Sequence, residues 1–175
     1  PEQSRLLRTK SRKVQKVTRQ LVDLAREMLE TMHQVEGVGL AAPQIGVPQR
    51  FFVAELPEDP DDPENELRRR PFILFNPEIV KGQGEQVGLE GCLSIPGYVA
   101  YVTRREHVWV VAQNRHGRKI KLAGTGLLSR AMQHELDHLQ GKLYTDYLDS
   151  MDDLIPVAQM ADDLSAAEEE LAPLA

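Results

Sequence analysis

The residues with the clearest chemical potential are two histidines and a glutamate in the stretch His134-Glu135-Leu136-Asp137-His138. On an α-helix, residues four apart lie on the same face, so His134 and His138 can direct two imidazoles at one metal ion. Glu135 follows His134 by about a third of a turn, which puts its carboxylate beside the ion, where it can accept a proton from an activated water. The pattern predicts a hydrolytic metal site, and such a site needs a third protein ligand if one position is to stay open.

A helix is predicted to carry this stretch. Apolar residues recur from Gly126 at spacings of three, four and seven, and Gly141 is expected to end the helix. A second amphipathic helix is predicted over residues 14–34, and a final one after Ser150. Strands are predicted over residues 51–56, 72–75, 78–80, 98–103, 107–113 and 118–122, with an exposed loop over 57–65. Because helices and strands do not alternate, we expect an α+β fold. Mixed or antiparallel sheets should surround the central metal-binding helix, with one helix near each end of the chain.

The composition bounds the class of protein. The chain has 175 residues, of which 41% are hydrophobic, and no apolar run approaches a membrane span of about 18 residues. We expect a single domain over residues 1–175, with an acidic helix or tail from about 150 to 175. A single cysteine cannot form an internal disulfide, which favours a reducing compartment.

Charge is distributed unevenly along the chain. The net charge is −6, yet the segment from Arg5 to Arg19 is basic, and no positive side chain follows Lys142. A basic segment of this kind either contacts RNA or another anionic surface or forms the solvated start of a helix. The second interpretation is favoured, and no direct binding to nucleic acid is expected.

The candidate third ligand is Cys92, in the stretch Glu90-Gly91-Cys92-Leu93-Ser94. A thiolate is a strong ligand for zinc or iron(II), and coordination would deprotonate the thiol at neutral pH. The alternative is a small cysteine buried in the core. The neighbouring glycines and Pro96 favour an ordered loop instead.

Three stretches together resemble the peptide deformylases, which carry the motifs G-x-G-L-A-A-x-Q, E-G-C-L-S and H-E-x-D-H in this order. Here the motifs are Gly37 to Gln44, Glu90 to Ser94 and His134 to His138. The resemblance implies a metal held by Cys92, His134 and His138, with Fe(2+) as the physiological ion and zinc or nickel as substitutes. It also implies hydrolysis of the N-formyl group from N-formylmethionyl nascent peptides, with release of formate.

The resemblance also implies roles for other residues. Glu135 would be the general base, while the Gln44 side chain and the backbone amide of Leu93 would stabilise negative charge on the formyl oxygen. Glu90 would orient its neighbours by hydrogen bonds, with Arg104 as a candidate partner. The remaining residues would contact the substrate, as an apolar methionine pocket or as backbone beside an extended peptide. They are Val38, Gly39, Leu40, Gly91, Leu127 and Ala131.

Two other functions fit parts of the pattern. A metallopeptidase shares the two histidines and the glutamate, but the metzincin pattern needs a third histidine where this chain has Tyr144. A non-enzymatic, metal-stabilised binding domain would need a closed site with four protein ligands, and the chain has no second cysteine. For the deformylase we expect the bacterial cytoplasm, with an organelle as the alternative, no membrane, and transient proximity to the ribosome. The acidic tail argues against docking on the ribosome through that tail.

Overall fold

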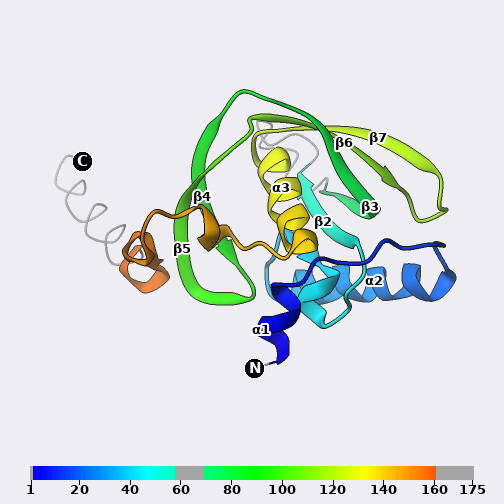
Figure 1. Ribbon diagram of the computed structural model, residues 1–175, viewed down its shortest axis with the longest axis horizontal. Coiled ribbons are helices and arrows are strands. Elements are labelled where there is room, and N and C mark those ends of the chain that lie inside the picture. Colours follow the sequence, from blue (N-terminus) through cyan, green and yellow to red (C-terminus); the bar gives the residue numbers. More distant parts are fainter. Residues whose placement is uncertain (1, 58–68, 161–175) are drawn as a thin grey trace, which may run out of the picture. The chain divides into compact units, whose positions relative to one another are not determined.

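The structure is a computed structural model, and it describes residues 2–57 and 69–160. The helices are α1 (Glu2–Leu7), α2 (Arg19–Gln34) and α3 (Gly126–Gln140), and short 3-10 helices are η1 (Ala42–Ile45), η3 (Tyr144–Tyr147) and η4 (Met151–Asp153). The strands are β1 (Gly39–Ala41), β2 (Phe51–Pro57), β3 (Arg69–Gln83), β4 (Gln86–Cys92), β5 (Ile95–Arg104), β6 (His107–Gln113), β7 (Lys119–Thr125) and β8 (Ile155–Pro156). Figure 1 labels the main elements along the chain.

The strands form a five-stranded sheet, in the order β1-β2-β3-β6-β7, and a three-stranded sheet, in the order β4-β5-β8. The neighbouring strands of the larger sheet pair antiparallel. The chain divides into two compact units. The first contains residues up to 86 and from 104 to 143, and the second contains residues 87–103 and those from 144 onwards.

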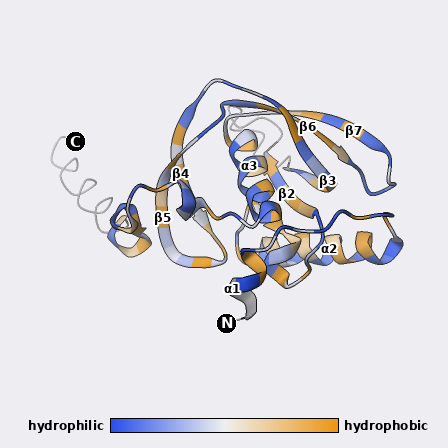
Figure 2. Ribbon diagram, in the orientation of Figure 1, coloured by the Kyte–Doolittle hydropathy of each residue, from blue (hydrophilic) through white to orange (hydrophobic). Residues whose placement is uncertain are grey.

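In the first unit, α2 and α3 cover opposite faces of the larger sheet. Successive side chains of a strand point to opposite faces, and β2 is apolar on both. Phe51 and Val53 pack with the buried side of α2, whereas Phe52 and Ala54 pack with α3. In Figure 2, α2 carries hydrophobic and hydrophilic residues in alternation, as expected of a helix with one buried side. This arrangement fixes α3, the predicted metal-binding helix, against the sheet.

The face of the sheet that α2 packs on remains partly open along β6 and β7. Along β6, the buried residues Val108, Val110 and Ala112 belong to the core under α3, while the residues between them are half-buried. An antiparallel sheet tolerates one solvated face, because its strands alternate apolar and polar residues. The solvated residues of β6 include Trp109, the only tryptophan of the chain.

The second unit has a small core of its own. Ala100, Val102 and Tyr144 are buried together, with Cys92 among the partly buried residues packed against them. The Tyr144 hydroxyl donates a hydrogen bond to the Tyr98 carbonyl oxygen at 3.2 Å. The described part of this unit is therefore held by β5 and the segment after α3.

The predicted α+β class is confirmed, and α3 covers the residues predicted for the metal-binding helix. The helix predicted over 14–34 begins only at Arg19, and two predicted strands, 72–75 and 78–80, form one strand, β3. The helix predicted after Ser150 is wrong over its first residues, where Met151–Asp153 form η4 and Ile155–Pro156 form β8. Residues 157–160 are helical, and the remainder lies outside the described residues, as does most of the predicted loop over 57–65. No helix in the described ranges has both the length and the apolarity needed to cross a membrane.

Candidate metal centre

The helix α3 presents the two predicted imidazole ligands from a rigid position. Its apolar residues Met132, Leu136 and Leu139 are buried in the core beneath the sheet. Gly141 ends the helix in the left-handed conformation, with φ of 76°. The rings of His134 and His138 lie 4.9 Å apart, centroid to centroid, at 81° to each other. Buried packing on one side of the helix thus leaves both rings close together.

Glu135 is buried, with 3% of its surface exposed, and it lies close to Gly39. A Cβ at position 39 would overlap the carboxylate oxygen Oε1 and would stand 2.8 Å from Cδ. Only glycine therefore fits on β1 beside this carboxylate. The motif from Gly37 to Gln44 and the motif from His134 to His138 are therefore in contact at Gly39 and Glu135.

A buried ion pair that the sequence analysis missed holds the middle of α3. The Arg104 Nη1 donates to Asp137 Oδ2 at 2.5 Å, and the two side chains are only 3% and 11% exposed. One turn earlier, Gln133 exchanges two hydrogen bonds with the backbone of Arg105, at 2.9 and 3.0 Å. The end of β5 therefore clamps the helix next to both histidines. No local pattern marks Arg104 as the partner of Asp137, because the two are far apart in sequence.

The strand β1 lies at an edge of the five-stranded sheet and pairs with β2. Its other edge can accept an extended peptide. Just after it, the backbone amide of Ala41 donates to the Gln44 side-chain oxygen at 2.7 Å. This bond fixes the carboxamide of Gln44 with its amino group as the remaining donor.

In the second unit, Cys92 ends β4 and is half-buried. The backbone amide of Ser94 donates to its sulfur at 3.4 Å. Burial raises the pKa of the Tyr144 hydroxyl, and the charges of Cys92 and Glu90 raise it further. Tyr144 therefore stays protonated in this cluster and can act as a hydrogen-bond donor.

Cys92, His134 and His138 each offer one ligand atom, and these atoms all lie within 4.8 Å of one another. One thiolate and two imidazoles are ligands that suit zinc or iron. Three protein ligands also leave a position open in a tetrahedral site, as a hydrolytic centre requires. The donor set therefore fits a divalent metal ion.

Comparison with known proteins decides the family. The sequence model of the polypeptide deformylases matches residues 2–153. A peptide deformylase from Thermomicrobium roseum is 46% identical over 146 residues, which is 82% of this chain and 80% of that protein. The chain belongs to the polypeptide deformylase family.

Solved structures of peptide deformylases support the same family assignment. A peptide deformylase from Synechococcus elongatus in complex with actinonin has a TM-score of 0.76 and 38% identity, over 85% of this chain and 76% of that one. A class I type b peptide deformylase from Acinetobacter baumannii, bound to Met-Ala-Ser, has a TM-score of 0.72 and 30% identity, over 82% and 92% of the two chains.

Membership in this family makes the chain an enzyme, a hydrolase that removes the N-formyl group from newly synthesised proteins. The family is metal-dependent, in agreement with the cysteine and histidine cluster. The two alternatives, a metallopeptidase and a non-enzymatic binding domain, are not favoured.

The contact between Gly39 and Glu135 leads to a prediction about deformylase activity. Gly39→Ala should lower kcat for formate release by about 10²-fold, because the added methyl group must displace the carboxylate, and displacements of about 1 Å have effects of this size. Gly82→Ala is the matched control, since its Cβ would meet, at 3.0 Å, only the flexible side chain of Arg105. Equal activity of the two variants would contradict the assigned contact.

Proposed function

We propose that Cys92, His134 and His138 together hold one Fe(2+) ion, which zinc or nickel can replace, and that the substrate is an N-formylmethionyl peptide. The observation that carries the proposal is the set of three ligand atoms within 4.8 Å of one another in a deformylase chain. When bound, the ion supplies Lewis-acid chemistry, by activating water and polarising the formyl carbonyl.

Glu135 is the proton carrier in this proposal. Its carboxylate accepts the proton of the attacking water as the new C–O bond to the formyl carbon forms. As the C–N bond breaks, Glu135 passes this proton to the leaving amine of methionine, so formate and a free N-terminus are released. Its burial supports the role, because a carboxylate shielded from solvent keeps its orientation and exchanges protons with the substrate rather than with bulk water.

Gln44 and Leu93 are the proposed donors to the formyl oxygen, on which negative charge grows during the attack. The side-chain oxygen of Gln44 already accepts a hydrogen bond from Ala41, so its amino group is oriented before the substrate binds. The backbone amide of Leu93 follows Cys92 directly. Donors fixed in advance need no reorganisation in the transition state.

The substrate peptide would extend along the outer edge of β1, the end strand of the sheet, where Gly39 and Leu40 would offer backbone groups, with Gly91 as a second backbone contact. Val38 and Leu127 are large apolar residues with 44% and 46% of their surface exposed. With the buried Ala131, they form the proposed pocket for the methionine side chain. Glu90 is 5% exposed and is assigned to orient neighbouring groups.

We infer that residues 1–175 form one deformylase domain, acting in the bacterial cytoplasm with transient proximity to the ribosome. Its relatives include bacterial peptide deformylases, which supports the compartment. Because the substrates are chains in synthesis, such proximity would shorten the search for a formylated N-terminus.

Formate release from formyl-Met-Ala-Ser tests the proposal. Protein purified without oxygen should contain about one metal ion per chain and should turn over this substrate, and chelator-treated protein should regain activity on loading with iron, nickel or zinc. Unformylated Met-Ala-Ser serves as the control and should not be cleaved. Absence of turnover with all three metals would defeat the proposal, and cleavage of the control peptide bonds would favour a metallopeptidase. Loss of activity on exposure to air is expected if the ion is Fe(2+).

A further inference from the structure

Two stretches of the chain carry basic side chains and no acid. The first runs from Gln3 to Val22, and the second from His107 to His134. The chain as a whole has 27 acidic and 21 basic residues, so these two stretches are positively charged within a chain of negative net charge. From the sequence, the first stretch is interpreted as the solvated start of a helix, and no direct binding to nucleic acid is expected, an expectation from which the proposal below departs. The sequence does not indicate that the second stretch lies beside it.

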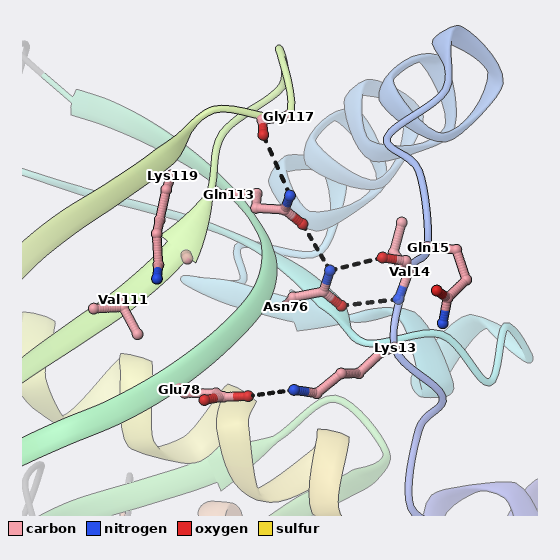
Figure 3. A pocket seen from close by; sticks show the side chains of 10 residues that line it. Lys13, Val14, Gln15, Asn76, Glu78, Val111, Gln113, Gly117 and Lys119 are labelled. Atoms are coloured by element: carbon pink, nitrogen blue, oxygen red, sulfur yellow. Dashed lines mark hydrogen bonds and ion pairs between the residues drawn. The ribbon is translucent and has the colours of Figure 1, made fainter.

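The structure brings the two stretches together in the first unit. A pocket of about 420 Å³ is lined by Lys13 and Val14 from the first stretch and by Gln113 and Lys119 from the second. Figure 3 shows these side chains around the pocket. A second pocket, of about 470 Å³, is lined by residues 17–19 of the first stretch and by Arg115 and His116 of the second, and also by Asp23 and Arg26 just after the first stretch. Two acid-free segments far apart in sequence thus contribute side chains to the same two pockets.

Hydrogen bonds through Asn76 fix the walls of this pocket. Asn76 accepts from the Val14 amide and donates to the Val14 carbonyl, both at 2.8 Å, and it also donates to Gln113 Oε1 at 2.7 Å (Figure 3). Gln113 in turn donates to the Gly117 carbonyl at 3.2 Å. Asn76 adopts a φ of 50°, which is uncommon outside glycine and which asparagine tolerates. The pocket is therefore preformed.

Lysines continue from the pocket along the open face of the sheet. Directly paired residues of neighbouring strands point to the same face, and β6 pairs Trp109 with Lys81, Val111 with Lys121, and Gln113 with Lys119. Lys81 Nζ lies 4.6 Å from the centre of the Trp109 ring. We name Lys13, Lys81, Lys119 and Lys121 the basic face. All four lysines are exposed.

One acid interrupts the basic face. Glu78 is the only acidic residue among the described residues that line the pocket, and Lys13 Nζ contacts its Oε1 at 2.9 Å. The hydrogen bond and charge of Lys13 lower the pKa of Glu78, and the charges of Arg50 and Lys119 lower it further. Positive charge therefore outweighs the single carboxylate on this face.

We propose that the basic face binds the phosphate backbone of RNA. Lys13 and Lys119 line the preformed pocket, and Lys81 and Lys121 lie on the same sheet face, so the four can attract consecutive phosphates. Such contacts need no particular base sequence. Trp109 already has Lys81 over its ring, so stacking of bases on this residue is not part of the proposal. A membrane surface fits less well, because Val14 and Ala112 of the pocket are buried and Val111 is half-buried, so the pocket offers little apolar surface for insertion.

The choice of RNA among polyanions rests on the proposed function. An enzyme whose substrates are chains in synthesis works where RNA is abundant, and electrostatic contact with RNA would raise its local concentration there. The basic face lies on residues assigned no part in catalysis, so RNA binding and deformylation can be measured separately.

Fluorescence anisotropy with a labelled RNA hairpin of about 20 nucleotides tests the proposal, with salt varied from about 50 to 200 mM. The wild-type chain should bind with Kd between about 10⁻⁶ and 10⁻⁴ M, weakening steeply as salt rises. Lys119→Glu/Lys121→Glu should weaken binding by about tenfold or more and reduce the slope of log K against log salt by about 1 to 2. Glu78→Gln, which removes the acid from the basic face, should tighten binding.

Arg70→Glu/Arg105→Glu is the matched control, because it changes the net charge equally at two exposed residues that are not part of the basic face. It should retain most of the affinity, and all three variants should release formate at the wild-type rate. The proposal is overturned if both double variants bind equally well, if the wild type does not bind the hairpin, or if it binds anionic phospholipid vesicles and not RNA. If the wild type binds the hairpin but releases no formate, the result would instead count against the proposed function alone.

Discussion

Glu135→Gln should lower kcat for formate release by about 10²- to 10⁴-fold while leaving the metal content unchanged. The substitution keeps the size and shape of the side chain and removes its ability to accept a proton, and a general base contributes an effect of this size. Because Glu135 is buried, bulk water cannot easily replace it as the proton acceptor. The measurements are steady-state formate release from formyl-Met-Ala-Ser and metal analysis of the same preparation.

Glu85→Gln is the matched control for this experiment. Glu85 is an exposed carboxylate that pairs with Arg105, and the same change there should leave kcat unaltered. Full activity of Glu135→Gln would remove Glu135 from the role of base. Loss of the metal from that variant would show instead that the carboxylate supports the ligands, so metal content separates the two roles.

The helix α3 could be predicted from the sequence because all its signals are local. Its apolar spacing, the two histidines and the glycine that ends it lie within one stretch, and the observed helix coincides with the predicted one. The strand β2 could be predicted as well, because each of its faces is covered by a helix and its residues are therefore apolar on both faces. Local periodicity is sufficient to predict a helix or strand wherever burial alone determines that element.

The prediction was wrong where a distant residue decides the backbone. Val14 has the spacing of a helical residue, but its amide and carbonyl are bound by Asn76, and the helix begins only after Thr18, whose side chain accepts from the Leu21 amide. Near Asn76 the pairing of β3 with β6 also shifts register, and here the sequence suggested two strands. A hydrogen bond between residues so far apart leaves no trace in a local pattern.

In the candidate site, too, the local features could be predicted from the sequence and the long-range contacts could not. The ligand types and their motifs are visible in the sequence, and their roles stay predictions until activity and metal content are measured. The contact between Gly39 and Glu135 and the ion pair of Arg104 with Asp137 became visible only in the structure, because they depend on how β1 and the end of β5 pack against α3.

Arg104→Met should lower the free energy of unfolding by about 3 to 5 kcal/mol, the cost of removing one partner from a buried ion pair. The Arg104 side chain is 3% exposed and lies 2.5 Å from a carboxylate oxygen of Asp137, so water cannot readily replace it. Urea unfolding of the wild type and the variant, both saturated with the same metal, measures the difference.

The neighbouring arginine provides the control. Arg105 pairs with Glu85 at 3.1 Å, but these side chains are 56% and 67% exposed, so Arg105→Met should cost less than about 1 kcal/mol. The double variant Arg104→Met/Asp137→Leu removes both charges and should recover much of the loss, because the penalty comes from the buried carboxylate that remains. If Arg104→Met is no more destabilising than Arg105→Met, the clamp on α3 is not energetically important. The histidines would then depend for their position on the apolar packing of α3 and on the hydrogen bonds of Gln133 with the Arg105 backbone.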